Sequence, residues 1–383
     1  MKFSYMPILK ALPSEITALS HLSEQDLNGV IPLMDFSLVK DPVKDKDKIP
    51  KRLQSSTALI EDQLVEICDN LSAVLANKYA LIDNYRWQPN SKIETGELVI
   101  SKIIHSLIEN KVKVIPVIGY DRWESEPYKQ FFKTVHFEGA PFYCLRLDRT
   151  AIEDSEDPEF FLEMIEKILD DLVLPVDKVV ILIDAGSIFS LDEDTVLDDF
   201  ERVINVLAPR GFKNFITAGC SLPATIDKAA EKDQTNILPR KEMTSWQYLR
   251  RSYDNLNIIY GDYGVKPAES AEGPAGIGGK ANAKIRYTID KAFYIVRGHM
   301  VKGEGKSKEK QIWGLAKKVV DSSHYMGEDY SFGDKRIKLC SEKKFNGGHP
   351  EWIVNDTCHH VVYSMDEIRS YDISLGNKNY FSI

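Results

Sequence analysis

Short apolar runs recur along the first 265 residues, and a polar or charged residue ends nearly every one of them. Stretches with hydrophobic residues at helical spacing follow most of these runs. The runs are rich in Ile, Val, Leu and Tyr, which is typical of parallel strands buried on both faces. There are eight such runs: Tyr5–Lys10, Val30–Asp35, Tyr79–Asp83, Val112–Gly119, Phe142–Asp148, Lys178–Asp184, Asn214–Gly219 and Asn257–Asp262.

Helix signals fill the gaps between the runs. Asp157 and Pro158 predict the start of a helix over Glu159–Leu174. Further helices are expected to open at Pro13 and to cover Leu53–Ala76, Gly96–Asn110, Asp192–Leu207 and Met243–Tyr253. Eight strand-helix units over about 250 residues favour an α/β fold with a closed (β/α)8 barrel of the TIM type. An open doubly wound sheet is the alternative, although no Gly-x-Gly-x-x-Gly follows the first run.

The composition changes after the eighth run. Lys266–Lys280 is rich in Gly and Pro, which predicts a loop. We therefore expect a barrel over residues 1–265, a glycine-rich linker loop over 266–282 and a C-terminal α+β module over 283–383. The module is expected to hold strands Ala283–Thr288, Ala292–Arg297, Arg336–Leu339 and His359–Tyr363, a basic linker Lys302–Lys310 and a helix Gln311–Asp321.

Charge and composition narrow the functional classes. The chain of 383 residues is 43% hydrophobic and carries a net charge of −9, which indicates a globular protein and argues against bulk nonspecific DNA binding. Its 5 Cys residues are not closely spaced, so we expect reduced thiols. No signal segment and no apolar stretch of membrane-spanning length is apparent. We expect a cytoplasmic protein without membrane association.

Aspartate ends five of the eight runs. In TIM barrels, the carboxyl ends of the strands form the rim of the active site. The candidate residues at this rim are Lys10, Asp35, Asp83, Arg146, Asp148, Asp184 and Asp262. If all of them point inward, five carboxylates and two cations share the barrel mouth. Burying that many charges is costly unless they are paired or bound to a metal.

Three interpretations of these carboxylates stay open. They can hold Mg²⁺ or Ca²⁺ through hard oxygen ligands. Two of them can serve as general acid and base, as in glycoside hydrolysis. Each can also simply cap the following helix or pair with Arg146, Lys10 or Arg122.

Phosphate recognition is suggested by the loops after the last two runs. Gly219 and Ser221 precede Pro223, where a helix start would leave backbone N–H groups free. Lys266 and Lys280 lie at the ends of the glycine-rich loop. TIM barrels often bind phosphate with these two loops, whereas a plain flexible loop is the alternative. Aromatic residues that could stack on a base or cover the barrel are Tyr85, Trp87, Tyr120 and Trp123.

The module offers further candidate ligand-binding residues: Arg286, Arg297, His359 and His360. On the strand expected there, adjacent histidines face opposite ways, so only one of them could reach a site. No spacing of His and Cys matches a zinc signature.

Several motifs together give a family resemblance. They are Tyr5–Ala11, Ile258–Gly264, Ala283–Thr288, Arg297-Gly298, Phe332-Gly333-Asp334 and Cys358-His359-His360. On these motifs the chain resembles the "beta protein" family, named from a protein of a T-even phage and found in phages and bacteria. Cys358 departs from the Asn expected before the two histidines. The resemblance implies a setting in phage conflict or antiviral defence, with a protein partner encoded by a neighbouring gene.

The leading hypothesis is that the barrel mouth binds, and hydrolyses, a phosphate-bearing ligand such as a nucleotide or a nucleic-acid end. An enzyme of this kind would be a hydrolase acting on phosphate esters. The alternative is a non-catalytic interaction or sensor protein, whose strand-end carboxylates only cap helices and form salt bridges.

Overall fold

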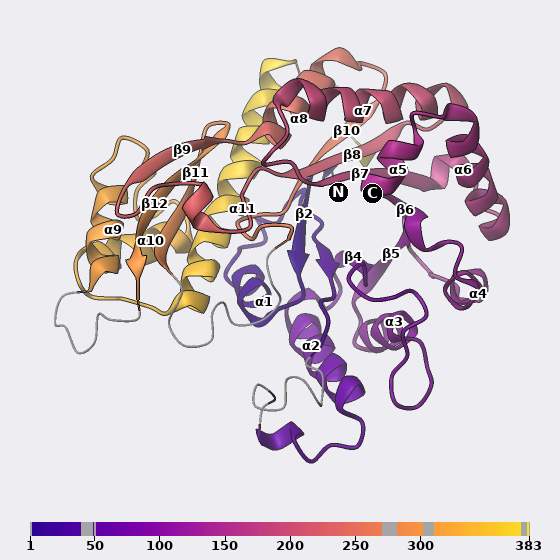
Figure 1. Cartoon of the computed structure of the whole chain (residues 1–383), viewed down its shortest axis with the longest axis horizontal. Coiled ribbons are helices and arrows are strands. Elements are labelled where there is room, and N and C mark those ends of the chain that lie inside the picture. The colour runs from indigo at the N-terminus through magenta and orange to yellow at the C-terminus, as the bar shows by residue number, and fades with distance from the viewer. Residues whose placement is uncertain are drawn as a thin grey trace.

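The computed structural model describes residues 2–39, 49, 51–269, 282–301, 310–376 and 381–382. Eight parallel strands form a closed barrel, because β10 pairs with both β2 and β8. This confirms the predicted (β/α)8 fold (Figure 1). The strands are β2 (Tyr5–Lys10), β3 (Leu33–Asp35), β4 (Tyr79–Asp83), β5 (Lys113–Gly119), β6 (Tyr143–Leu147), β7 (Val179–Ser187), β8 (Asn214–Cys220) and β10 (Asn257–Asp262).

Helices cover the outside of the barrel. They are α1 (Pro13–Ser20), α2 (Leu59–Leu75), α3 (Val99–Glu109), α4 (Glu126–Thr134), α5 (Arg149–Asp154), α6 (Pro158–Leu172), α7 (Glu193–Leu207) and α8 (Lys241–Ser252). Asp157 and Asp192 cap α6 and α7 by accepting backbone N–H groups. The helix predicted to begin at Leu53 begins at Leu59, because Leu53 closes a separate 3-10 turn over Lys51–Leu53.

Side chains of the barrel strands alternate between two layers of core. Met6, Leu81 and Leu182 belong to the layer inside the barrel. Tyr5 and Tyr260 belong to the layer between the barrel and its helices. This alternation follows the two-residue period of a strand, and it decides which strand-end residues face the barrel interior.

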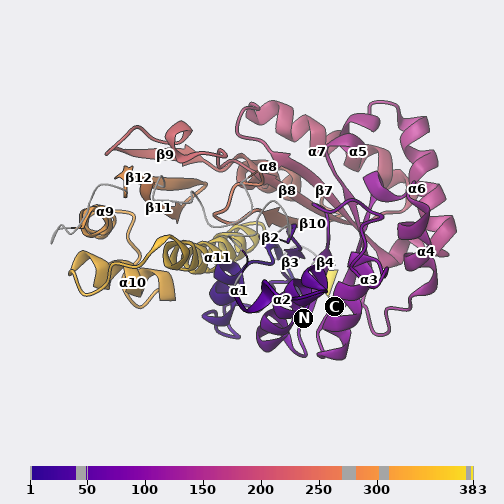
Figure 2. The same cartoon turned by 60° about the horizontal axis from the view of Figure 1, so that its bottom comes forward.

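The C-terminal region is built around a three-stranded antiparallel sheet with the order β11-β12-β9. Strands β11 (Asn282–Ile289) and β12 (Ala292–Met300) follow the barrel, whereas β9 (Thr235–Pro239) comes from the segment between β8 and α8. Helices α9 (Gln311–Val320), α10 (Phe332–Ser341) and α11 (His349–Ser374) pack on this sheet. Figure 2 shows α11 running from the module to the barrel, where it contacts α1. From here on, the module means this three-stranded sheet together with α9, α10 and the first half of α11.

Two predicted strands of the module are wrong. Arg336–Leu339 lies in α10 and His359–Tyr363 lies in α11. The β-branched run at Val361 reads locally as a strand, but apolar residues recur at helical spacing through the whole segment and are buried. They are Val354, Cys358, Val361, Met365 and Ile368. On a helix, both His359 and His360 can be buried, each against a different partner.

A glycine permits the close contact of α10 and α11. A Cβ atom on Gly333 would collide with the carbonyl oxygen of Asn355. Two short end strands, β1 (Lys2–Phe3) and β13 (Phe381–Ser382), also pair with each other. Most of the predicted glycine-rich loop and of the basic linker Lys302–Lys310 lies outside the described residues. Within the described ranges, no helix combines the length and apolar character that crossing a membrane requires.

Candidate functional site

Four of the five predicted carboxylates gather at the carboxyl ends of the strands, inside the barrel mouth. The strand register pairs Lys10 with Asp35 and Asp35 with Asp83, so these residues end three neighbouring strands at one level. Each shares a strand face with an inside residue, namely Ile8, Leu33 and Leu81. All three side chains therefore face the barrel interior, and all are buried.

Arg146 lies at the centre of the mouth and is fully buried. Its Nη1 donates to Asp83 at 2.6 Å, and its Nη2 donates to Asp184 at 2.6 Å. Arg122 donates to Asp83 with both Nη atoms, at 2.6 and 3.2 Å. Burial disfavours the Asp83 carboxylate, but the two guanidinium groups outweigh it and hold its pKa below the usual value. These contacts support the salt-bridge interpretation for Asp83 and Asp184.

Asp35 and Asp148 lie beside this network and carry protons more readily. Burial raises the pKa of the Asp35 carboxyl to about 6, although Arg146 opposes the rise. One oxygen of Asp35 is buried with no hydrogen-bond partner within the described structure. Burial and the nearby Asp121 raise the pKa of Asp148 to about 6 as well, while Arg146 again opposes. Asp148 also caps α5 through the Ala151 N–H.

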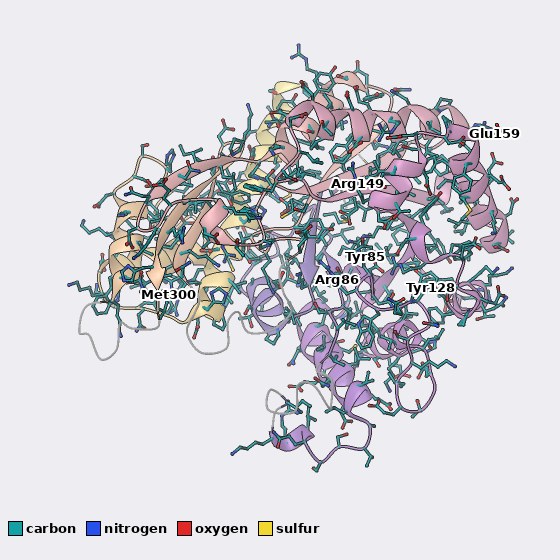
Figure 3. All side chains as sticks on the ribbon, in the orientation of Figure 1. Tyr85, Arg86, Tyr128, Arg149, Glu159 and Met300 are labelled. Atoms are coloured by element: carbon teal, nitrogen blue, oxygen red, sulfur yellow. The ribbon has the colours of Figure 1, made fainter. Side chains whose placement is uncertain are left out.

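Aromatic and basic residues from the segment after β4 cover the network. The Tyr85 ring lies 4.1 Å from the Arg146 guanidinium carbon, within the range of a cation–π contact. Arg86 follows Tyr85 (Figure 3) and donates to the carbonyl oxygen of Ala268 in the segment after β10. Tyr263 donates to Asp184 at 2.7 Å from the same segment. Segments after two strands on different sides of the barrel thus meet over Arg146.

Asp262 ends β10 but does not join this group. It shares a strand face with Tyr260, which belongs to the outer layer of the core, so its side chain points out of the barrel toward α11. There it accepts hydrogen bonds from Tyr5 at 2.8 Å, Tyr260 at 2.8 Å and His360 at 2.9 Å. The expectation that all strand-end carboxylates face the mouth is therefore wrong for Asp262.

Arg240 completes this second cluster. It donates to Glu367 of α11 at 2.7 Å and lies 3.6 Å from Asp262. Burial alone would raise the pKa of Asp262, but His360 and Arg240 hold it well below the usual value. We call Asp262, His360, Arg240 and Glu367 the seam, because they join the barrel to α11.

The predicted phosphate loop after β8 is engaged in packing. Gly219 faces outward, where a Cβ atom would press on Ile188. Ser221 is buried, donates to Glu242 and accepts the Lys241 N–H at 2.9 Å, so it serves the start of α8. Burial raises the pKa of Glu242 to about 7. The Ser221 hydroxyl is therefore committed to Glu242.

The module candidates also lie away from the mouth. Arg286 pairs with Asp356, and Arg297 donates to the Ala230 carbonyl oxygen at 2.7 Å. His359 contacts Asp334 at 2.8 Å, so it belongs to the interior of the module rather than to the seam. The structure brings none of the four predicted module residues into the mouth.

Metal binding finds no support in the described residues, where no three His, Cys, Asp or Glu side chains come together as a metal-binding group. Sequence reasoning named Arg122 only as a possible salt-bridge partner of the strand-end carboxylates, which it is for Asp83, and it did not select Tyr263. Tyr263 could have been found, because it lies two positions after Gly261, on the strand face that Ile259 places inside the barrel. Arg122 ends a short 3-10 helix over Tyr120–Arg122, and the sequence pattern does not reveal that this turn directs it to Asp83.

Comparisons with known proteins identify a family. A family model described as "Beta protein" matches residues 5–366. No curated protein matches the chain. Among solved structures, a GH18 chitinase from Pseudoalteromonas aurantia has a TM-score of 0.36 and 9% identity, and the match covers 56% of this chain and 93% of the chitinase. A trimodular GH5_4 subfamily endoglucanase has a TM-score of 0.27 and 10% identity, covering 65% of this chain and 56% of that one. The fold assignment rests on the strand pairing.

Proposed function

The chain belongs to the Beta protein family, and from that premise we propose that its barrel mouth binds and hydrolyses a small phosphate-bearing ligand, with a nucleotide as the leading candidate. One observation carries the proposal. The Arg146 guanidinium lies under the half-buried Tyr85 ring and interacts with Asp35 and Asp148, two carboxyls whose pKa values are raised to about 6. Raised carboxyl pKa values beside a buried cation are typical of functional sites.

Each group has a role in this proposal. Tyr85 offers a ring face on which a base can stack, and Arg146 and Lys10 supply positive charge to the phosphate. Near pH 6, where both pKa values lie, one of Asp35 and Asp148 can be ionised while the other keeps its proton. The ionised carboxylate takes a proton from the attacking water as the new O–P bond forms. The protonated carboxyl gives its proton to the leaving oxygen as the old P–O bond breaks.

A specific observation favours the second candidate, a sensor that binds without catalysis. Asp83 and Asp184 already accept hydrogen bonds from five of the six guanidinium nitrogen atoms of Arg122 and Arg146. A phosphate would have to share these donors. Family membership suggests an antiviral setting for either candidate. We propose a cytoplasmic location, which the five buried, unpaired cysteines support because such thiols persist in reducing compartments.

Hydrolysis separates the two candidates. Phosphate release from a panel of nucleotides should fall by roughly 100-fold in Asp148→Asn, because the amide cannot transfer a proton. Asp192→Asn is the matched control, since Asp192 caps a helix in the same way and is exposed. Equal rates in both variants would contradict the catalytic role. Binding without any phosphate release by the wild type would leave the sensor candidate.

A further inference from the structure

A cavity lies in the module, away from the barrel mouth. It has a volume of about 200 Å³ and opens where β11 begins, where β12 ends and where α9 and α11 begin. Met300, labelled in Figure 3, marks this end of the molecule. Six lining residues matter here: Lys284, Lys310, His349, Gly348, Ile312 and Trp352. None of them has a part in the proposed reaction at the mouth.

The charge around this cavity is positive and incompletely balanced. Arg286 uses Asp356 as its partner, with Nε and Nη2 both 2.9 Å from the same carboxylate oxygen. Within the described part of the chain, no carboxylate forms an ion pair with Lys284. Glu351, in the first turn of α11, accepts the N–H of Gly348 at 2.9 Å and is exposed.

The pKa values of two lining groups, Lys284 and His349, are lowered in this positively charged surrounding. Burial and the nearby Arg286 lower the pKa of Lys284 to about 8. Burial, Arg286 and Lys284 lower the pKa of His349 to about 4. Burial and repulsion by the neighbouring cations therefore both favour the uncharged forms of Lys284 and His349, although Asp356 partly offsets this at Lys284. A bound anion would relieve this repulsion.

Part of the cavity lining is apolar. The Trp352 ring lines the cavity, and its indole N–H already donates to the Asn346 carbonyl oxygen at 2.8 Å. Ile312, in the first turn of α9, adds to this apolar lining. The first turns of α9 and α11 also bring the positive ends of two helix dipoles to the cavity, in addition to its lysines.

We propose that this cavity binds a small molecule that carries one anionic group, a phosphate or a carboxylate, on a compact apolar body. Lys284 and Lys310 contact the anionic group, while Trp352 and Ile312 contact the apolar body. The site is separate from the barrel mouth and does not depend on the function proposed there. Arg286 donates to the carbonyl oxygen of Val265 at 2.7 Å, so the neighbouring cation reaches the segment after β10.

The test is titration calorimetry of the full chain with phenyl phosphate, benzoate and the neutral benzyl alcohol. At least one of the two anions should bind, and benzyl alcohol should bind about tenfold more weakly or worse. The tighter of the two anions identifies the anionic group. Lys284→Met should weaken the binding of that anion by about tenfold or more, because the methionine side chain is of similar length but carries no charge. The melting temperature of the Lys284→Met variant, measured in parallel, should stay at or above that of the wild type.

Two controls fix the position of the site. Lys317→Met removes an exposed lysine from α9 and should leave binding unchanged. Tyr85→Leu alters the barrel mouth and should also leave binding unchanged. The proposal is overturned if neither anion binds, if benzyl alcohol binds as tightly as the anions, or if a folded Lys284→Met variant binds as the wild type does. Loss of binding in Tyr85→Leu would place the probe at the mouth instead and would equally overturn it.

Discussion

Asp184 and Asp262 lie near the carboxyl ends of two strands of the same barrel, yet one points into the mouth and the other into the seam. Asp184 shares a face with Leu182, inside the barrel, and pairs with Arg146. Asp262 shares a face with Tyr260, outside the barrel, and pairs with His360. A strand-final position therefore indicates the rim of the barrel, but the alternation of the strand decides which side of the rim a charge occupies.

The carboxyl groups of the two clusters also differ in their pKa values. In the seam, Asp262 accepts several hydrogen bonds and its pKa lies below the usual value. In the mouth, Asp35 and Asp148 have raised pKa values near 6. The Asp262 carboxylate therefore stays ionised and stabilises the junction of barrel and α11. A carboxyl with a pKa near 6 can instead exchange a proton with a ligand.

The largest effect is expected in the seam. Asp262→Ala leaves Arg240 and His360 buried without their shared carboxylate, which should cost about 3–5 kcal/mol of unfolding free energy. Urea unfolding near pH 7 measures this loss. As the control, Asp366→Ala removes an exposed carboxylate of α11 that pairs with Arg369, and it should cost less than about 1 kcal/mol. Equal costs would show that the seam does not hold the barrel and α11 together.

A smaller effect of opposite sign is expected at Asp35. Because its folded-state pKa is raised to about 6, protonation of Asp35 stabilises the fold below about pH 4, and this contribution is lost as the pH rises through about 6. Asn cannot ionise. Asp35→Asn should therefore exceed the wild type in stability at about pH 8, on the order of 1–3 kcal/mol, and gain nothing at about pH 4.

Asp83→Asn provides the contrast for that experiment. Its carboxylate pKa is lowered by Arg122 and Arg146, so its contribution to stability is present at neutral pH and is lost as the pH falls below the usual range. Asp83→Asn should lose stability at about pH 8. A loss of stability at pH 8 in Asp35→Asn as well would mean that Asp35 is held as an ion.

The sequence was sufficient to predict the barrel, because eight buried strands repeat one simple pattern. It could not orient Asp262, since both faces of β10 carry apolar residues and alternation alone does not tell which face is inside. Strand β9 was missed because Thr235–Pro239 is short, largely exposed and paired only with a strand that lies more than fifty residues later. The segment around His359 resembles a strand locally because Val361 and Val362 are β-branched, whereas its helical spacing is apparent only over the whole of His349–Ser374.

The most direct test compares two tyrosines that make the same kind of bond in the two clusters. Tyr263 donates to Asp184 in the mouth and Tyr5 donates to Asp262 in the seam, each at 2.8 Å to one carboxylate oxygen. Tyr263→Phe and Tyr5→Phe should each cost about 1–2 kcal/mol of stability. In titration calorimetry with the best-bound nucleotide, only Tyr263→Phe should change the affinity, by roughly threefold to tenfold. Wild-type affinity in Tyr263→Phe together with altered affinity in Tyr5→Phe would contradict the placement of the ligand site in the barrel mouth.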